Sequence, residues 1–400
     1  MISLSNGFKS QYNHKEGSRI IIIRRYLLSV SAYLIFIILT FFTGCSSKVE
    51  IFSPYKGIDW DNVIQARAQL HTHTTASDGY FSPHYVVDRY HELGYDILAI
   101  TDHWLVTYPW QEFSSFEVSS RTYRRQDEGD LVGLSHNDVF VYNNRNPEDL
   151  GMLAVKGAEP SHTGPRNHHM VSLFSDVSGE GMDFEETLAA NEKAGGLSSF
   201  AHPARSRERD NNDVEDYIYF FDNYPHIFGI DIFTRATFRE PGRWPYSKEL
   251  LSGLLMHYGS PGSDNWRPVW MTSTDDLHRI EDIDQGYQVQ LLDKLDQENV
   301  YKSLKEGAFF WVAKAPDEQA PVIGSVDFNG SRITVSGTGY DHVAWYFNNE
   351  KIHNGESFDF LKDGSDDVFY VYFMAYTSDF SIDRQQGALI GSQPFWIERQ

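Results

Sequence analysis

The stretch LHTHTTASDG, residues 70–79, carries two histidines that are two positions apart, next to a short apolar segment. Residues i and i+2 of a β-strand point to the same face, so the side chains of His71 and His73 can reach one ion. Asp78 lies just beyond this strand and can reach a neighbouring ion. Imidazole and carboxylate groups bind divalent transition metals, so this stretch predicts a metal site.

Other side chains of the same chemical type also lie beside apolar, strand-like runs. Because α/β barrels place their chemistry at the C-terminal ends of their strands, this recurrence predicts one polynuclear metal centre. At two places neighbouring residues are alternatives, namely His168 or His169 and Asp275 or Asp276. The candidate ligands beyond residues 70–79 are His103, Glu159, His169, His202, Asp276 and His278, with Asp102 available to orient an imidazole.

Apolar runs alternate with amphipathic segments from residue 67 to about residue 312. This alternation predicts a mostly parallel sheet, and six or seven repeats indicate a closed or nearly closed α/β barrel over residues 67–316, with an insertion at 104–150. Residues 317–400 instead carry short alternating strands separated by Asn-Gly turns, which predict a C-terminal antiparallel β-sandwich domain. Barrel strands are expected at 68–71, 97–100, 152–155, 170–174, 197–200, 227–233, 269–272 and 308–312.

The single cysteine, Cys45, ends a segment of export type. Arg24 and Arg25 precede an apolar run at residues 26–42, which leads into Thr43-Gly44-Cys45. Residues 1–45 therefore resemble a bacterial lipoprotein signal peptide, in which the cysteine carries lipid after cleavage. An ordinary transmembrane anchor is the alternative. We expect a protein of the bacterial cell envelope that is attached to the membrane through lipid on Cys45, with a linker at 46–66.

The net charge of the chain indicates which classes of macromolecule it is expected to bind. A formal net charge of −22 argues against long nucleic acid as a partner, since such binders usually present a basic stripe. No obligate protein partner is inferred. An apolar content of 41% is consistent with packed cores.

In their order along the chain, these motifs resemble the four-part signature of the polymerase and histidinol phosphatase (PHP) family. The best match is the branch of metallohydrolases related to carbaryl-ester hydrolases, over residues 68–312. The resemblance implies a distorted (βα)7 TIM-like barrel that holds three metal ions. Because nine candidate ligands exceed what one ion can use, we expect two to three divalent transition metal ions, of Zn, Mn or Fe. The resemblance assigns His71, His73, Glu159 and Asp276 to one ion, Glu159, His169 and His202 to a second, and Asp78, His103 and His278 to a third.

We expect this chemistry to serve hydrolysis of a phosphomonoester or phosphodiester, a small anionic ester, by metal-activated hydroxide. Glu159, Asp276 and Arg205 are the expected catalytic residues, because a guanidinium just past His202 can clamp an anionic oxygen. Other candidate clamps are Arg166, Arg235 and Arg279.

Two alternatives to phosphoester hydrolysis remain open. The same metal ions could hydrolyse a carboxyl ester, carbamate or amide. A basic clamp over the site favours a phosphate substrate, whereas an apolar pocket built from residues 104–150 favours an ester. The second alternative is a non-catalytic surface lipoprotein that binds glycans or metal through its β-sandwich.

Overall fold

The computed structural model describes residues 49–108, 145–163, 167–205 and 213–399, together with the short strands β4 (Ser115–Glu117) and β5 (Val139–Val141). Residues from Val49 to Glu398 form one compact unit. The expected signal peptide, Cys45 and most of the insertion at 104–150 lie outside the described residues. Among the described residues, no helix has the length and apolar character needed to cross a membrane.

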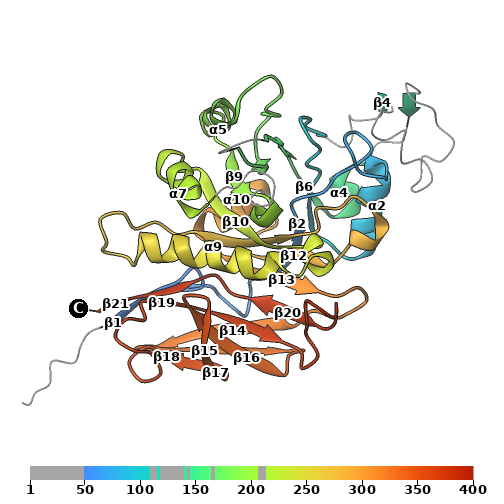
Figure 1. Ribbon diagram of the computed structural model, residues 1–400. Coiled ribbons are helices and arrows are strands. Elements are labelled where there is room, and N and C mark those ends of the chain that lie inside the picture. The colour runs from blue at the N-terminus through green and yellow to red at the C-terminus, as the bar shows by residue number, and fades with distance from the viewer. Residues whose placement is uncertain are drawn as a thin grey trace, which may run out of the picture. The chain divides into compact units, whose positions relative to one another are not determined.

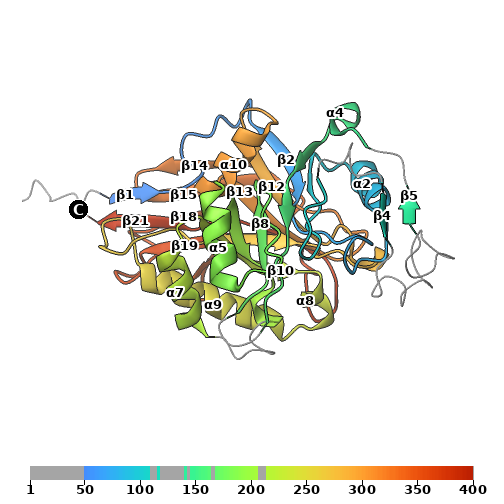
Figure 2. The ribbon, with the colours of Figure 1, turned by 90° about the horizontal axis from the view of Figure 1, so that it is seen from above.

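The first sheet has eleven strands and contains both parallel and antiparallel neighbours (Figures 1 and 2). Strands β2, β3 and β6 are parallel, whereas β12 is antiparallel to both β2 and β13. The bounds of these strands are β2 (Ile64–Gln69), β3 (Ile97–Ala99), β6 (Leu153–Val155), β12 (Gly286–Leu292) and β13 (Phe309–Lys314).

The second sheet has five strands, in the order β11-β10-β9-β8-β7. Its strands β9, β10 and β11 are parallel, while β8 is antiparallel to both β7 and β9. The bounds are β7 (Gly157–Ala158), β8 (Met170–Leu173), β9 (Leu197–Phe200), β10 (Ile227–Thr234) and β11 (Trp270–Thr274).

Two isolated bridges join these sheets just past their strand ends. Thr72 pairs with Leu277, and His103 pairs with Glu159, both in parallel orientation. The bridges draw the segments that follow β2, β3, β7 and β11 together at one end of the fold. The fold is therefore mixed α/β, and the complete seven-stranded barrel stays a prediction because strand pairing divides its strands between two sheets.

The helices cover the outer surface of the strands that lead to this end (Figure 2). Asp183 begins one of them with a capping box, in which its side chain and that of Glu186 satisfy each other's backbone N–H groups. The helices are α2 (Pro83–Glu92), α4 (Pro147–Leu150), α5 (Phe184–Lys193), α7 (Val214–Asn223), α8 (Ala236–Arg239), α9 (Arg243–Tyr258) and α10 (Gln297–Glu306), with a 3-10 turn η1 at Ile280–Asp282.

The C-terminal strands are antiparallel, and several of them extend the first sheet. Strand β13 pairs with β20, so this sheet continues across the boundary expected near residue 316. Strands β14 (Val322–Asn329), β15 (Arg332–Thr338) and β18 (Ser357–Asp359) form a separate three-stranded sheet. The strands that join the first sheet are β1 (Val49–Phe52), β16 (His342–Phe347), β17 (Glu350–Asn354), β19 (Tyr370–Tyr376), β20 (Ala388–Gly391) and β21 (Phe395–Arg399).

The expectation of a mostly parallel sheet is thus only partly met, and strand β12 was not predicted. Residues 286–292 read GYQVQLL, and the two glutamines interrupt the apolar run that would mark a strand. Both glutamines are buried, and Nε2 of Gln290 donates to Oε1 of Gln288 at 2.8 Å. Ser303 donates to Oε1 of Gln290 at 2.7 Å. These hydrogen bonds, one between the two glutamines and one from Ser303 of α10, satisfy buried polar groups in a way that composition alone does not indicate.

Candidate metal centre

The loop after β2 is shaped by close packing around Gly79. A Cβ atom at this position would lie 2.6 Å from the backbone carbon and oxygen of His73, so only glycine fits without a backbone shift. This packing folds the loop back on itself and brings Asp78 near the His73 ring, with Oδ1 at 3.6 Å from Nδ1. The motif Ser77-Asp78-Gly79 therefore sets the geometry of the site.

Glu159 lies at the centre of the candidate site and contacts five imidazoles. Its Oε1 lies 3.0 Å from Nδ1 of His169 and 3.1 Å from Nε2 of His202. Its Oε2 lies 3.4 Å from Nε2 of His71, 3.1 Å from Nε2 of His73 and 3.0 Å from Nδ1 of His103. This carboxylate is completely buried. Its two oxygens face different sets of rings, as a bridging ligand requires.

Among the residues that the structure describes, two compact groups of side chains could each hold an ion. In each group one ligand atom per residue lies within 4.8 Å of all the others. The resemblance had assigned His73 to the same ion as His71, whereas here it falls in the group of Asp78. His169 contacts Glu159 but belongs to neither group. The groups are His71, Glu159, His202 and Asp276, and His73, Asp78, His103 and His278.

The chemistry of these residues fits a bound cation. Oε2 of Glu159 and Oδ1 of Asp276 are buried and accept no hydrogen bond, although imidazole nitrogens surround both. Burial disfavours a charged ring at His71, but the carboxylates of Glu159 and Asp276 outweigh it and raise the pKa of His71 to about 10. A proton on His71 thus offsets part of the carboxylate charge in the metal-free protein. A nitrogen and oxygen donor set of this kind suits Zn, Mn or Fe.

Backbone and carboxylate partners orient the rings. Nδ1 of His278 lies 2.9 Å from the carbonyl oxygen of Asp276, which can only accept, so Nδ1 carries the proton and Nε2 is left for a metal ion. That Nε2 lies 3.2 Å from Oδ1 of Asp78. Behind His71, Oδ2 of Asp231 lies 3.8 Å from Nδ1, on the ring side opposite Glu159. Asp231 was missed in the sequence, because it stands inside the fully buried strand β10 with no motif around it.

Two of the candidate ligands have left-handed backbone conformations. His202 has φ 31° and Asp276 has φ 50°, which are uncommon for residues other than glycine. Such conformations persist only where the surrounding structure enforces them, and they concentrate at functional sites. The backbone N–H of Asp276 donates to the carbonyl of His71 at 3.1 Å, which ties the two ligand segments together.

The structure separates the paired alternatives. His168 packs among aromatic rings, including Tyr217 with ring centroids 4.5 Å apart, and burial lowers its pKa to about 3. His169 faces Glu159 instead. Asp275 accepts hydrogen bonds from the hydroxyl of Tyr90 at 2.7 Å and from the backbone of residues 284–286, whereas Asp276 faces the imidazoles. His169 and Asp276 are therefore the members placed at the site.

Asp102 has a different role from the one expected. Its Oδ1 accepts from the backbone N–H of Thr74 at 2.7 Å and from the hydroxyl of Ser77 at 2.6 Å. Its Oδ2 accepts from the hydroxyl of Thr107 at 2.7 Å. Asp102 thus fixes the loop between His73 and Asp78, because its short side chain reaches the loop hydroxyls and backbone.

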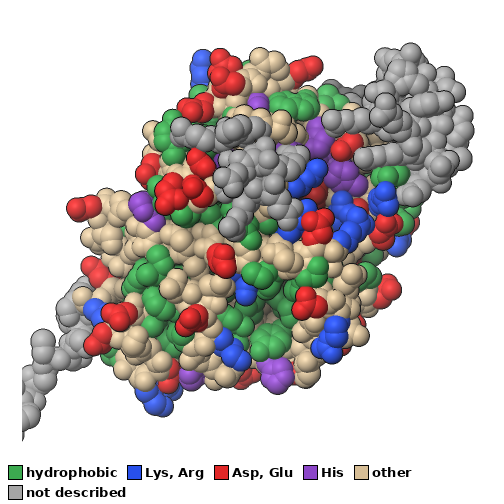
Figure 3. Space-filling view, in the orientation of Figure 1, with side chains coloured by type: hydrophobic (Ala, Val, Ile, Leu, Met, Phe, Trp, Pro, Cys, Tyr) green, Lys and Arg blue, Asp and Glu red, His purple; other side chains and the backbone are tan. Residues whose placement is uncertain are grey.

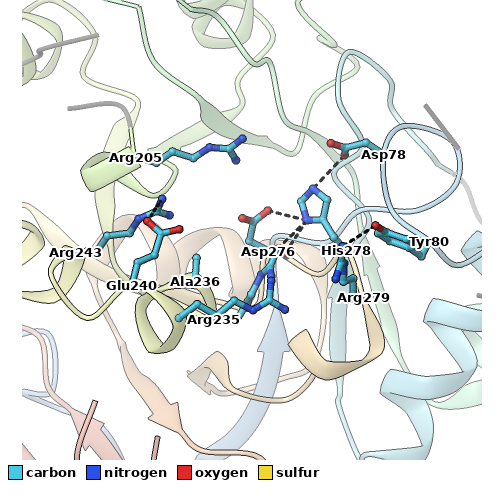
Figure 4. Close-up of a pocket in the computed structure, with 11 residues that line it drawn as sticks. Asp78, Tyr80, Arg205, Arg235, Ala236, Glu240, Arg243, Asp276, His278 and Arg279 are labelled. Atoms are coloured by element: carbon cyan, nitrogen blue, oxygen red, sulfur yellow. Dashed lines mark hydrogen bonds and ion pairs between the residues drawn. The ribbon is translucent and has the colours of Figure 1, made fainter. Parts of the chain in front are cut away.

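A pocket of about 410 Å³ opens beside Asp78, Asp276 and His278, and five arginines line it (Figure 4). Arg205 extends into this pocket on the side of Asp276 (Figure 4). Figure 3 shows histidine side chains next to lysine or arginine side chains at the surface. Arg166 lies outside the described residues, and Arg239 and Arg243 were not anticipated. The five arginines are Arg205, Arg235, Arg239, Arg243 and Arg279.

Comparison with known sequences gives no match, either to a family model or to a curated protein. Solved structures show partial similarity at low identity. One is a two-domain protein from Bacteroides vulgatus that contains a predicted PHP-like metal-dependent phosphoesterase. It is 14% identical, with a TM-score of 0.46 over 88% of this chain and 100% of that chain.

Two further structures are similar over a smaller share of the chain. A candidate metal-dependent phosphoesterase from Bifidobacterium adolescentis is 16% identical, with a TM-score of 0.36 over 60% of this chain and 96% of its own. An amidohydrolase from Chromobacterium violaceum is 15% identical, with a TM-score of 0.33 over 54% of this chain and 88% of its own.

Proposed function

We propose that the protein is a metal-dependent hydrolase that cleaves a phosphomonoester or phosphodiester. The observation that carries this proposal is the position of the arginine-lined pocket, which shares Asp78, Asp276 and His278 with the two candidate metal groups. An anionic ester in this pocket would place its reacting group against these side chains. The pocket would hold the rest of a small substrate.

The residues that would hold the ions are the two groups of four described above, with His169 as an additional contact of Glu159. Divalent ions bound there would activate a water molecule as the nucleophile and offset negative charge on the phosphoryl oxygens. Glu159 has the central position that a bridging ligand requires. As the sequence resemblance implies, the proposed enzyme would have a complete distorted barrel and would bind a third ion.

The arginines favour a phosphate over a neutral ester. A guanidinium matches the geometry of phosphate oxygens and forms charge-assisted hydrogen bonds with them. Arg205 is the best placed for this role, since its backbone N–H donates to the carbonyl of His202 at 2.9 Å and its side chain extends into the pocket. Arg235 and Arg239 also pair with Asp282, Arg243 with Glu240 and Arg279 with Glu281, so the preference for an anion rests chiefly on Arg205. A neutral carboxyl ester, carbamate or amide would form no charge-paired contact with this guanidinium. The described pocket thus favours phosphoester hydrolysis over hydrolysis of a carboxyl ester, carbamate or amide.

Within this proposal the protein acts in the bacterial cell envelope, anchored by lipid on Cys45. The support is the order of basic residues, apolar run and Thr43-Gly44-Cys45 in the sequence. The substrate would then be a small anionic ester that is present outside the cytoplasm.

A panel of matched substrates tests the activity. Residues from Val49 onward should hydrolyse an aryl phosphate or aryl phosphodiester with a higher kcat/KM than the corresponding aryl acetate, and chelation should abolish the activity. Arg205→Ala should lower kcat/KM for the phosphate roughly tenfold or more, because a charged hydrogen bond to the substrate is lost. Arg332→Ala in strand β15, whose side chain is 49% exposed, serves as the control and should have no effect. A preference for the acetate that Arg205→Ala leaves unchanged would instead support carboxyl-ester hydrolysis.

A further inference from the structure

Asp282 is a fully buried carboxylate at the end of the 3-10 turn η1, next to the arginine-lined pocket. Its Oδ2 accepts from the backbone N–H of His278 at 3.2 Å and of Arg279 at 2.8 Å. Its Oδ1 accepts from Nη1 of Arg235 at 2.8 Å and from Nη2 of Arg239. The two oxygens of one side chain thus bind two different parts of the site.

These partners come from separate segments of the chain. Arg235 precedes α8 and Arg239 ends it, whereas His278 belongs to the segment that follows β11. Nη2 of Arg235 also lies 3.5 Å from Nδ1 of His278, so this guanidinium is close to a candidate metal ligand. Asp282 therefore connects the two arginines of the α8 region with the segment that carries the candidate ligand His278.

We propose that Asp282 is a positioning residue that orients Arg235 and Arg239 toward an anionic ester held at the metal centre. This inference rests on the proposed function, because it assigns the arginines to substrate binding. A guanidinium that donates a hydrogen bond to a fixed carboxylate oxygen loses rotational freedom, and its remaining N–H groups then have a more defined direction. The ordering occurs in the free protein and need not be achieved on binding.

The change in anion binding that follows removal of the negative charge of Asp282 distinguishes a positioning role from a purely electrostatic role. Replacing Asp282 by asparagine removes a negative charge beside the pocket, so a purely electrostatic role predicts tighter anion binding. A positioning role predicts weaker binding, because the amide cannot hold two guanidinium groups and two backbone N–H groups together. Glu281 provides a matched control in the same turn. It contacts Arg239 at 3.4 Å and Arg279 at 3.6 Å, but its side chain is 54% exposed.

The experiment compares Asp282→Asn with Glu281→Gln in the metal-loaded protein. For Asp282→Asn we expect the KM for an aryl phosphate and the inhibition constant of inorganic phosphate each to rise roughly tenfold. The KM for an aryl acetate and the metal content should change little. Glu281→Gln should change every one of these values by less than about twofold, because exposed ion pairs contribute little. Arg235→Lys keeps the charge but loses the fork, and should reproduce the rise if Asp282→Asn does not fold.

Two results would overturn the proposal. One is tighter phosphate inhibition in Asp282→Asn, which would leave only a charge effect. The other is an equal loss toward both substrates together with loss of metal, which would mean that Asp282 only supports the segment around His278. If the wild-type protein hydrolyses the acetate but no phosphate ester, the proposed phosphoesterase activity fails. The inhibition constant of inorganic phosphate, measured against the acetate, then still decides the role of Asp282.

Discussion

Oδ2 of Asp231 lies 3.8 Å from Nδ1 of His71, while Nε2 of the same ring faces Glu159 at 3.4 Å. The carboxylate is itself fixed by the hydroxyl of Thr272, which donates to Oδ1 at 2.6 Å. A carboxylate behind a metal-binding imidazole orients the ring and makes it a stronger ligand. At 3.8 Å the contact is an ion pair and not a hydrogen bond, and we predict that it orients the His71 ring.

Asp231→Asn should therefore weaken metal binding roughly 10-fold to 100-fold, with little loss of stability in the metal-free protein. The measurement is metal affinity by competition with a chelating dye. Asp222→Asn is the control, because Asp222 accepts from the hydroxyl of Tyr258 at 2.9 Å, away from the site. Equal affinities for Asp231→Asn and wild type would show that Asp231 does not orient His71.

The adjacent histidines 168 and 169 should respond in opposite ways to substitution by asparagine. His169→Asn removes a contact of Glu159 and should greatly reduce activity. His168→Asn should keep the bound metal but lower the free energy of unfolding by about 1–3 kcal/mol, because a smaller polar group would replace a ring packed between aromatic side chains. Thermal unfolding and elemental analysis of both variants check this. Metal loss in His168→Asn alone would reverse the assignment.

Local rules in the sequence point to the segments that form the centre, because the candidate ligands lie beside recognisable apolar runs. The two-residue period of a strand predicts that His71 and His73 reach the same ion, but strand β2 ends at Gln69 and the two histidines fall in different candidate groups. The choice between His168 and His169 depends on the register of β8, which is fixed by its antiparallel pairing with β9. No local pattern contains that register.

Residues whose role depends on distant partners could not be found in this way. Asp231 lies in a strand that is buried on both faces, so there is no alternation to indicate where its side chain points. Arg239 and Arg243 reach the pocket because α8 and the start of α9 fold beside the segment after β11. Strand β12 escaped prediction for a related reason, since its glutamines are satisfied only in the folded protein.

Gly79→Ala should disrupt the centre although the added group is a single methyl. The new Cβ would lie 2.6 Å from backbone atoms of His73, so the loop must shift and carry Asp78 with it. We expect a loss of about 1–3 kcal/mol in the free energy of unfolding and a lower metal content. Gly242→Ala is the matched control, because no heavy atom lies within 4 Å of its Cβ position. Normal metal content in Gly79→Ala would mean that the loop tolerates the shift.

Cys45→Ser tests the proposed anchor. Without the thiol, no lipid can be attached, so the protein should leave the membrane fraction or accumulate as an uncleaved precursor. Cell fractionation followed by mass spectrometry of the N-terminus distinguishes these two products. A cleaved Cys45→Ser protein that stays in the membrane fraction would contradict lipid attachment at this residue and favour another mode of association.

Metal binding should release protons near pH 8, and His71 should be a principal source of them. Burial alone would lower the pKa of His71, but Glu159 and Asp276 raise it to about 10, so the ring is protonated in the metal-free protein and must lose this proton to bind a metal ion. His202 differs, because burial lowers its pKa to about 4 and it has no proton to release. Calorimetric titration in buffers of different ionisation enthalpy measures the number released. His71→Ala should reduce the number of released protons by about one, whereas His202→Ala should leave this number unchanged.

The same raised pKa sets how the stability of the metal-free protein depends on pH. A histidine whose pKa is higher in the folded state contributes its full stabilisation below the unfolded value of about 6.5, and this stabilisation is lost as the pH rises toward 10. The melting temperature of the metal-free protein should therefore fall across this range, and it should fall less steeply in His71→Ala. Bound metal replaces the proton as the source of positive charge, so the metal-loaded protein should keep its melting temperature over the same interval. Parallel curves for the metal-free wild type and His71→Ala would show that His71 is not protonated in the folded state.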